Sequence, residues 1–212
     1  NVSAGELARI DRRKTLEGFG VKIEYIKQAV TNKPLSYTIN QTMMRIDLPV
    51  ALKPGQQFVL DIGWNYKIPD RMSLGGRGGY EFFPEDGNHL FTMTQWFPRM
   101  CVYSDFQGWQ HKQFTGRGEF ALTFGNYDVT ITVPGDHLVA ATGECQNYAE
   151  VLSPAQMGRW QKAQTAKEPV EVGLLADAVN AEKGKSSKTK TWRYKASMVR
   201  DFAWTSSRKY IW

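Results

Sequence analysis

The sequence is poor in cysteine, and its two cysteines do not form a recognisable motif. The 212 residues contain only Cys101 and Cys145, whose spacing fits neither a zinc site nor a redox pair. An oxidising compartment would allow a disulfide between them, and the sequence leaves that alternative open. Cys101 lies among apolar residues, which favours a buried structural thiol over a nucleophile.

Motifs of the common hydrolases are also missing. The chain has no His-Glu-x-x-His, and no two of its three histidines, His89, His111 and His137, lie within one helical turn. It has no Gly-x-Ser-x-Gly elbow either. Gly116–Ala121 has the letters of a dinucleotide fingerprint, but we expect a strand rather than a helix to follow it. The sequence therefore predicts no complete catalytic site, metal site or cofactor site in this chain.

Acidic and aromatic residues leave one rival function open. Glu81, Glu85 and Asp86 could supply a carboxylate pair for glycoside chemistry, although a solvated loop face explains them more simply. Tryptophans could stack on sugar rings, which keeps a carbohydrate- or ligand-binding β-sandwich as the alternative. The candidates for such stacking are Trp96, Trp109 and Trp160.

Long apolar runs are absent, so we expect no membrane span. The net charge of +6 could indicate nucleic-acid binding, but no helix-turn-helix, aromatic RNA-binding signature or basic helix accompanies it. Much of the excess charge sits near the ends and in one Gly/Ser/Lys stretch, which predicts solvated charge and no nucleic-acid partner. Those clusters are Arg12 to Lys14, Lys183 to Lys190, and Arg208 with Lys209. The sequence shows no signal peptide and begins Asn-Val-Ser, and we expect it to be part of a larger protein.

Aromatic residues are abundant, and period-2 alternation is the dominant pattern. The clearest case has one face made of Phe58, Leu60, Ile62, Trp64 and Tyr66, and Val21, Ile23 and Tyr25 are expected to share a face in the same way. Eight to ten such runs predict a mainly β fold with a sandwich-like architecture. The remaining predicted strands cover about 35–39, 44–48, 90–97, 100–103, 119–133, 137–142, 191–196 and 202–211.

Two stretches depart from this texture. Residues 68–88 are rich in glycine and proline and are predicted to be a loop, in which the role of Gly75–Gly79 is open. Ser153-Pro154 has the form of a helix N-cap followed by proline, and helices are predicted over 155–166 and 172–183. The chain is thus expected to be one β domain, 1–212, with a helical insertion at about 153–188.

Four segments, in order, resemble the alanyl-aminopeptidase family, the gluzincin zinc aminopeptidases. The most specific runs Thr94-Gln95-Trp96-Phe97-Pro98-Arg99-Met100-Cys101-Val102-Tyr103-Ser104-Asp105. The others are 118–134, Val139-Ala-Ala-Thr-Gly-Glu, and Val199-Arg-Asp-Phe-Ala-Trp. Two features depart from the family pattern: the gap between Gln95 and Arg99 is short, and Val-Tyr-Ser-Asp replaces the usual Pro-Cys-Phe-Asp.

The resemblance implies a saddle-like β-sandwich that precedes a thermolysin-like catalytic domain. It also implies that the chain itself is not an enzyme, and that zinc, the general base and the catalytic residues belong to the parent's C-terminal catalytic domain, its partner. Gln95 matches the position of a glutamine that binds the free N-terminal amine of the peptide substrate, and an amide oxygen can accept a hydrogen bond from an ammonium group. The alternative is that Gln95 only ends a strand. The helical insertion suggests a bacterial subgroup, with the periplasm or cell envelope as the expected location.

Overall fold

The structure is a computed structural model that describes residues 3–5, 7–8, 17–113 and 121–212. It is mainly β, with 36% strand against 16% helix, and its sheets are antiparallel. The chain divides into two compact units, residues 1–68 with 97–123 and residues 69–96 with 124–212. The prediction of one domain over the whole chain stays a prediction.

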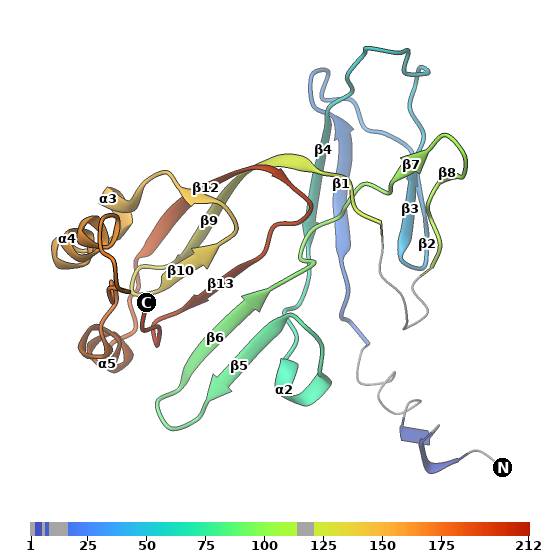
Figure 1. Ribbon diagram of the computed structural model, residues 1–212. Helices are drawn as coiled ribbons and strands as arrows, with labels where there is room; N and C mark the ends of the chain where they lie inside the picture. Colours follow the sequence, from blue (N-terminus) through green and yellow to red (C-terminus); the bar gives the residue numbers. More distant parts are fainter. Residues whose placement is uncertain (1–2, 6, 9–16, 114–120) are drawn as a thin grey trace. The chain divides into compact units, whose positions relative to one another are not determined.

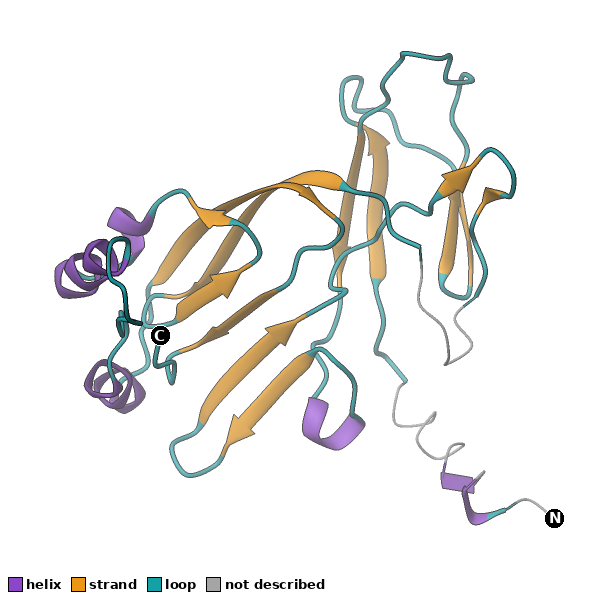
Figure 2. Cartoon of the chain, in the orientation of Figure 1, coloured by secondary structure: helices purple, strands orange, loops and turns teal. Residues whose placement is uncertain are grey.

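Unit 1, the first of these, is built from two-stranded ribbons (Figures 1 and 2). Its strands are β1 (Lys22–Gln28), β2 (Tyr37–Asn40), β3 (Met43–Ile46), β4 (Leu60–Asn65), β7 (Tyr103–Ser104) and β8 (Gly108–Trp109). They pair as β1 with β4, β2 with β3 and β7 with β8.

The register of β1 corrects one prediction. The pairing with β4 shifts between Ile23 and Tyr25, and such a bulge changes which side chains share a face. Ile26 is therefore the buried residue, whereas Val21 and Tyr25 are 46% and 44% exposed. Tyr25 lies over Gly63, where a Cβ would come within 2.3 Å of the ring. The strand predicted here is confirmed as β4 without Phe58 and Tyr66, but its burial does not alternate, since Asp61 and Gly63 are partly buried like Leu60, Ile62 and Trp64.

One glutamine ties β2 and β3 to the segment that follows β8. The Gln113 side chain accepts from the Thr42 backbone N–H at 3.2 Å and from its hydroxyl at 2.6 Å, and it donates to the Asn40 carbonyl at 2.8 Å. Cys101 Sγ lies 3.9 Å from Met43 Sδ on the same turn. The β2–β3 turn is thus held from two sides.

Unit 2 packs a four-stranded sheet with a three-stranded sheet. The first has the order β10-β13-β6-β5 and the second β11-β12-β9. Their strands are β5 (Gly79–Phe83), β6 (Asn88–Met93), β9 (Gly125–Pro134), β10 (Leu138–Ala141), β11 (Glu144–Cys145), β12 (Thr189–Val199) and β13 (Trp204–Ser207).

Alternation along β12 builds the core of unit 2. Trp192, Tyr194 and Ala196 are buried, while the residues between them are exposed. Trp192 faces Ile131 across the pairing with β9. The Tyr194 hydroxyl donates to the Val139 carbonyl of β10 at 2.8 Å, which joins the two sheets. Full burial of one large apolar side chain contributes roughly 1.5–3 kcal/mol, so this alternating face is a main source of stability.

The helices of the C-terminal half gather beside the strands of unit 2 (Figure 2). They are α3 (Tyr148–Val151), α4 (Pro154–Ala163) and α5 (Leu175–Lys183), and the last two fall inside the predicted insertion. Ser153 caps α4 with a full capping box completed by Gln156, as the Ser-Pro pattern predicted. Arg159 bonds the Val172 carbonyl at 2.7 Å and also pairs with Asp177, which fastens α4 to α5.

Three other strand or loop predictions are wrong. The predicted loop 68–88 contains α2 (Arg71–Leu74) and β5, because Gly79 lets the chain pass Pro69 where a Cβ would lie 2.4 Å from its carbonyl oxygen. The predicted strand 100–103 is regular only from Tyr103. The predicted strand 202–211 is shorter in the structure, where β13 covers Trp204–Ser207. The next residue, Arg208, forms a buried ion pair with Asp136. Residues 116–120 of the fingerprint-like segment, and 119–120 of the strand predicted to start there, lie outside the described residues.

Candidate functional site

The two ends of the four-stranded sheet carry different kinds of polar residue. In the register of β13, Trp204 lies opposite Met93 of β6 and Ala141 of β10. Ser207 lies opposite Leu90 and Leu138 at the other end. Gln95 follows β6 at the first end and Arg208 follows β13 at the second, so the sheet separates them.

Gln95 is exposed and has an unfavourable backbone. It stands two residues after the last residue of β6, and its φ is 52°, in the left-handed region. For a residue with a Cβ this conformation costs about 1–2 kcal/mol. The amide makes no hydrogen bond with any described residue. Since strained non-glycine residues gather at functional sites, this outlier supports a hypothesis of function.

Aromatic residues beside Gln95 hold the sheet end in place. The Trp96 indole donates to the Phe202 carbonyl at 3.0 Å, and its ring meets that of Trp204 edge-on at 6.3 Å. Phe202 is fully buried. Three of the four segments that carry the family resemblance therefore meet here: Thr94-Gln95-Trp96, the β10 segment, and the segment that leads into β13.

Two buried polar atoms at this end lack partners. The Thr94 hydroxyl and the Trp204 indole N–H are buried, and neither forms a hydrogen bond within the described part of the chain. An unsatisfied buried polar group costs about 1–3 kcal/mol. Gly78 approaches Thr94 closely, since a Cβ on Gly78 would lie 3.0 Å from the Thr94 hydroxyl.

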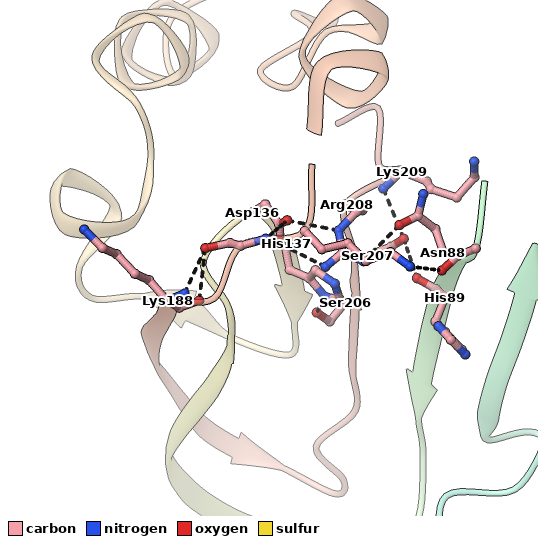
Figure 3. Close-up of polar contacts among 12 residues, drawn as sticks. Asn88, His89, Asp136, His137, Lys188, Ser206, Ser207, Arg208 and Lys209 are labelled. Atoms are coloured by element: carbon pink, nitrogen blue, oxygen red, sulfur yellow. Dashed lines mark hydrogen bonds and ion pairs between the residues drawn. The ribbon is translucent and has the colours of Figure 1, made fainter. Parts of the chain in front are cut away.

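At the opposite end, Arg208 forms a buried clamp (Figure 3). Its guanidinium donates two bonds of 3.1 Å to the two oxygens of Asp136, and a third bond of 2.9 Å to the side-chain oxygen of Asn88. Asp136 also accepts from the Ser186 backbone N–H at 2.8 Å. Burial alone would raise the pKa of Asp136, but these hydrogen bonds outweigh it, so the pKa is lowered.

A second ion cluster lies next to the clamp. Lys209 pairs with Asp86 and, at 3.0 Å, with Glu182 of α5, and it lies over the Phe83 ring. The hydrogen bond from Lys209 lowers the pKa of Asp86, and the same bond raises the pKa of Lys209. These contacts connect the β5–β6 turn to α5. They also occupy Asp86, one of the three carboxylates that are candidates for glycoside chemistry.

His137 and Ser206 form a pair that resembles a nucleophile and its base. His137 Nδ1 lies 2.7 Å from the Ser206 hydroxyl oxygen. However, the two residues are only 2% and 0% exposed, so no substrate can reach the hydroxyl. Burial, followed by the positive charge of Arg208, lowers the pKa of His137 to about 4. The imidazole is therefore neutral near pH 7 and acts as a buried hydrogen-bonding group.

The other candidate residues remain apart. Among the described residues, no group of three or more His, Cys, Asp or Glu could hold a metal ion. Glu81 pairs with Arg71 at 3.1 Å, and both cysteines are free. Of the three tryptophans considered for sugar stacking, Trp109 is 52% exposed, whereas Trp96 and Trp160 are partly buried.

The sequence missed the clamp. Arg208 and Lys209 were interpreted as solvated terminal charge, but Arg208 is 8% exposed and both are ion-paired. The signal was Asp136, which follows a Pro-Gly turn directly after the longest alternating run of unit 2. An acid at such a strand end is a candidate partner for a distant arginine.

No protein-family model, curated protein or solved structure matches this chain. Within the described residues, no helix has the length and apolar character to span a membrane.

Proposed function

We propose that this chain is a noncatalytic β module of a zinc aminopeptidase-like protein, in which it packs on the catalytic domain and helps to bind the peptide N-terminus. The observation that carries the proposal is Gln95, which is exposed and strained at the sheet end where three of the resembling segments meet. The zinc and the catalytic groups belong to the partner domain.

The chemistry of Gln95 fits this role. The substrate's free α-amine is an ammonium group with three donors, and a glutamine amide accepts one without adding a charge. A side chain without a hydrogen-bond partner among the described residues is available for such a bond, whereas the clamp residues at the other end are engaged. A hydrogen bond to a charged group contributes about 1.5–3 kcal/mol, which corresponds to roughly a 10- to 150-fold effect.

The test uses the protein in which this chain is joined to a zinc-binding domain. Gln95→Ala should raise KM for peptides with a free N-terminus by at least 10-fold, with little change in the inhibition constants of N-acetylated peptides, which lack the ammonium group. Gln41→Ala is the matched control, because Gln41 is also an exposed glutamine with left-handed φ, 54°, but lies in the β2–β3 turn. Equal kinetics for the two variants would refute the role of Gln95, and the absence of a His-Glu-x-x-His in the following ~150 residues would refute an active parent.

One observation favours the second candidate, carbohydrate binding. Tyr103 and Trp109 are 61% and 52% exposed and meet edge-on at 5.2 Å across β7 and β8. Trp109→Ala should abolish any signal of the 212-residue chain on a glycan array, with Phe82→Ala, 48% exposed in unit 2, as the control. An array without signal for the unmodified chain removes this candidate.

A further inference from the structure

Unit 2 contains a small pocket beside the Arg208 clamp. It is lined by residues of α4, α5, β12 and the turn after β9, among them Asp136, His137, Gln156, Asp177 and Lys190. Its volume is about 50 Å³. A water molecule needs about 10–15 Å³ of such space, so the pocket has room for a few water-sized groups and not for a nucleotide or sugar.

The acidic side chains of the pocket are already engaged. Both oxygens of Asp136 accept from Arg208, and one of them also accepts from Ser186. One oxygen of Asp177 accepts from Arg159 and from the Leu174 backbone N–H. Each carboxylate thus has its own arginine, and these two pairs add no net charge to the pocket.

Lys190 is the cation without a carboxylate. Its ammonium group donates to the Val151 carbonyl at 2.9 Å, and it forms no ion pair within the described residues. Burial lowers the pKa of Lys190, and Asp136 opposes that shift. Two of its three N–H donors have no partner in the described part of the chain. Lys209 with Asp86 and Glu182 carries one net negative charge nearby, but none of these three residues lines the pocket.

Gln156 adds a second donor. Its side-chain oxygen accepts from the Ser153 backbone N–H at 3.0 Å as part of the α4 cap, which leaves the NH₂ group for other contacts. His137, neutral near pH 7, contributes no compensating charge. The pocket therefore offers donors on Lys190 and Gln156 and one ammonium group without a paired carboxylate among the described residues, while both oxygens of Asp136 and one oxygen of Asp177 are engaged.

We infer that this pocket binds a small monovalent anion, with chloride as the reference ligand, held by Lys190 and Gln156. An anion would complete the hydrogen bonding of the ammonium group and supply its missing counter-charge. The small volume favours a halide or a carboxylate of formate size over larger anions. The inference is independent of any aminopeptidase function.

The test measures the melting temperature of the 212-residue chain in sodium chloride and in sodium gluconate at equal ionic strength, because gluconate is too large for the pocket. Chloride should raise the melting temperature relative to gluconate by about 3–6 °C per tenfold increase above half-saturation. Lys190→Met should lose this difference. Lys195→Met should keep it, because Lys195 is exposed and pairs with Asp128 on the same strand pair.

A chloride effect that persists in Lys190→Met, or identical curves in the two salts for the unmodified chain, overturns the inference. Chloride-35 NMR decides the matter if Lys190→Met does not fold. Line broadening by the unmodified chain that bromide displaces supports the site, and broadening no greater than in protein-free buffer refutes it.

Discussion

Replacing Arg208 with methionine is predicted to be the most damaging single change at the clamp. Methionine keeps most of the side-chain length but removes all three hydrogen bonds to Asp136 and Asn88. Asp136 would then keep the Ser186 N–H and its own backbone N–H as partners but no cation within the described residues, while remaining largely buried, since its side chain is 14% exposed. The penalty arises mainly from this uncompensated buried charge.

The magnitude follows from the burial of the pair. Removing one partner of a buried ion pair costs about 3–5 kcal/mol, whereas an exposed pair contributes about 0–1 kcal/mol. For a chain of this size, 1 kcal/mol corresponds to about 2–4 °C, so Arg208→Met should lower the melting temperature by about 6–20 °C. The matched control is Arg193→Met, whose partner is Glu150 and whose pair is 50% and 62% exposed.

Urea unfolding followed by circular dichroism and tryptophan fluorescence measures both variants, and a double-mutant cycle isolates the pair. The variant Asp136→Asn with Arg208→Met should be less destabilised than the sum of the single variants, because no charge is left alone. Equal losses of under 1 kcal/mol for Arg208→Met and Arg193→Met would refute the argument that burial makes this pair important.

Two further predictions concern the same sheet. Because the pKa of His137 is about 4 in the folded chain and about 6.5 in the unfolded one, the unfolded state binds more protons between these values, and stability should fall by about 3 kcal/mol as pH drops from 6.5 to 4. Urea unfolding of His137→Gln should show a shallower pH dependence over that window, and an unchanged slope would contradict this. Gln95→Gly should raise the free energy of unfolding by about 1 kcal/mol, because glycine adopts a φ of 52° without strain; a loss of stability would show that the Gln95 side chain makes contacts that matter.

The strands that one buried face defines could be predicted from the sequence. β9 and β12 alternate more buried and exposed residues, and the Ser153 cap of α4 is a local pattern. Local patterns do not predict which residues of a strand are buried when a neighbouring strand sets the register. The bulge in β1 depends on its pairing with β4, and β5 was hidden because its flanking glycines and prolines also fit a loop.

The candidate sites were predictable to different degrees for a related reason. Gln95 was found because its neighbours form a specific segment, but its left-handed backbone is a property of the folded chain. The clamp and the Lys190 pocket join residues that are far apart, such as Asn88 with Arg208 and Val151 with Lys190. Neither contact produces a periodic pattern in the sequence. The charges of Arg208 and Lys190 therefore indicate side chains exposed to solvent.

The contrast between the two ends of the sheet separates stability from recognition. At the Arg208 end, the guanidinium, both Asp136 oxygens and the Ser207 hydroxyl all form hydrogen bonds inside the chain, and removing Arg208 is costly. At the Gln95 end, the Thr94 hydroxyl and the Trp204 indole lack partners among the described residues, and Gln95 itself is exposed and strained. Glycine at position 95 and an apolar residue at 94 would remove these costs. The partner domain that we propose would contact this end of the sheet, whereas the clamp stabilises the other end from within the chain.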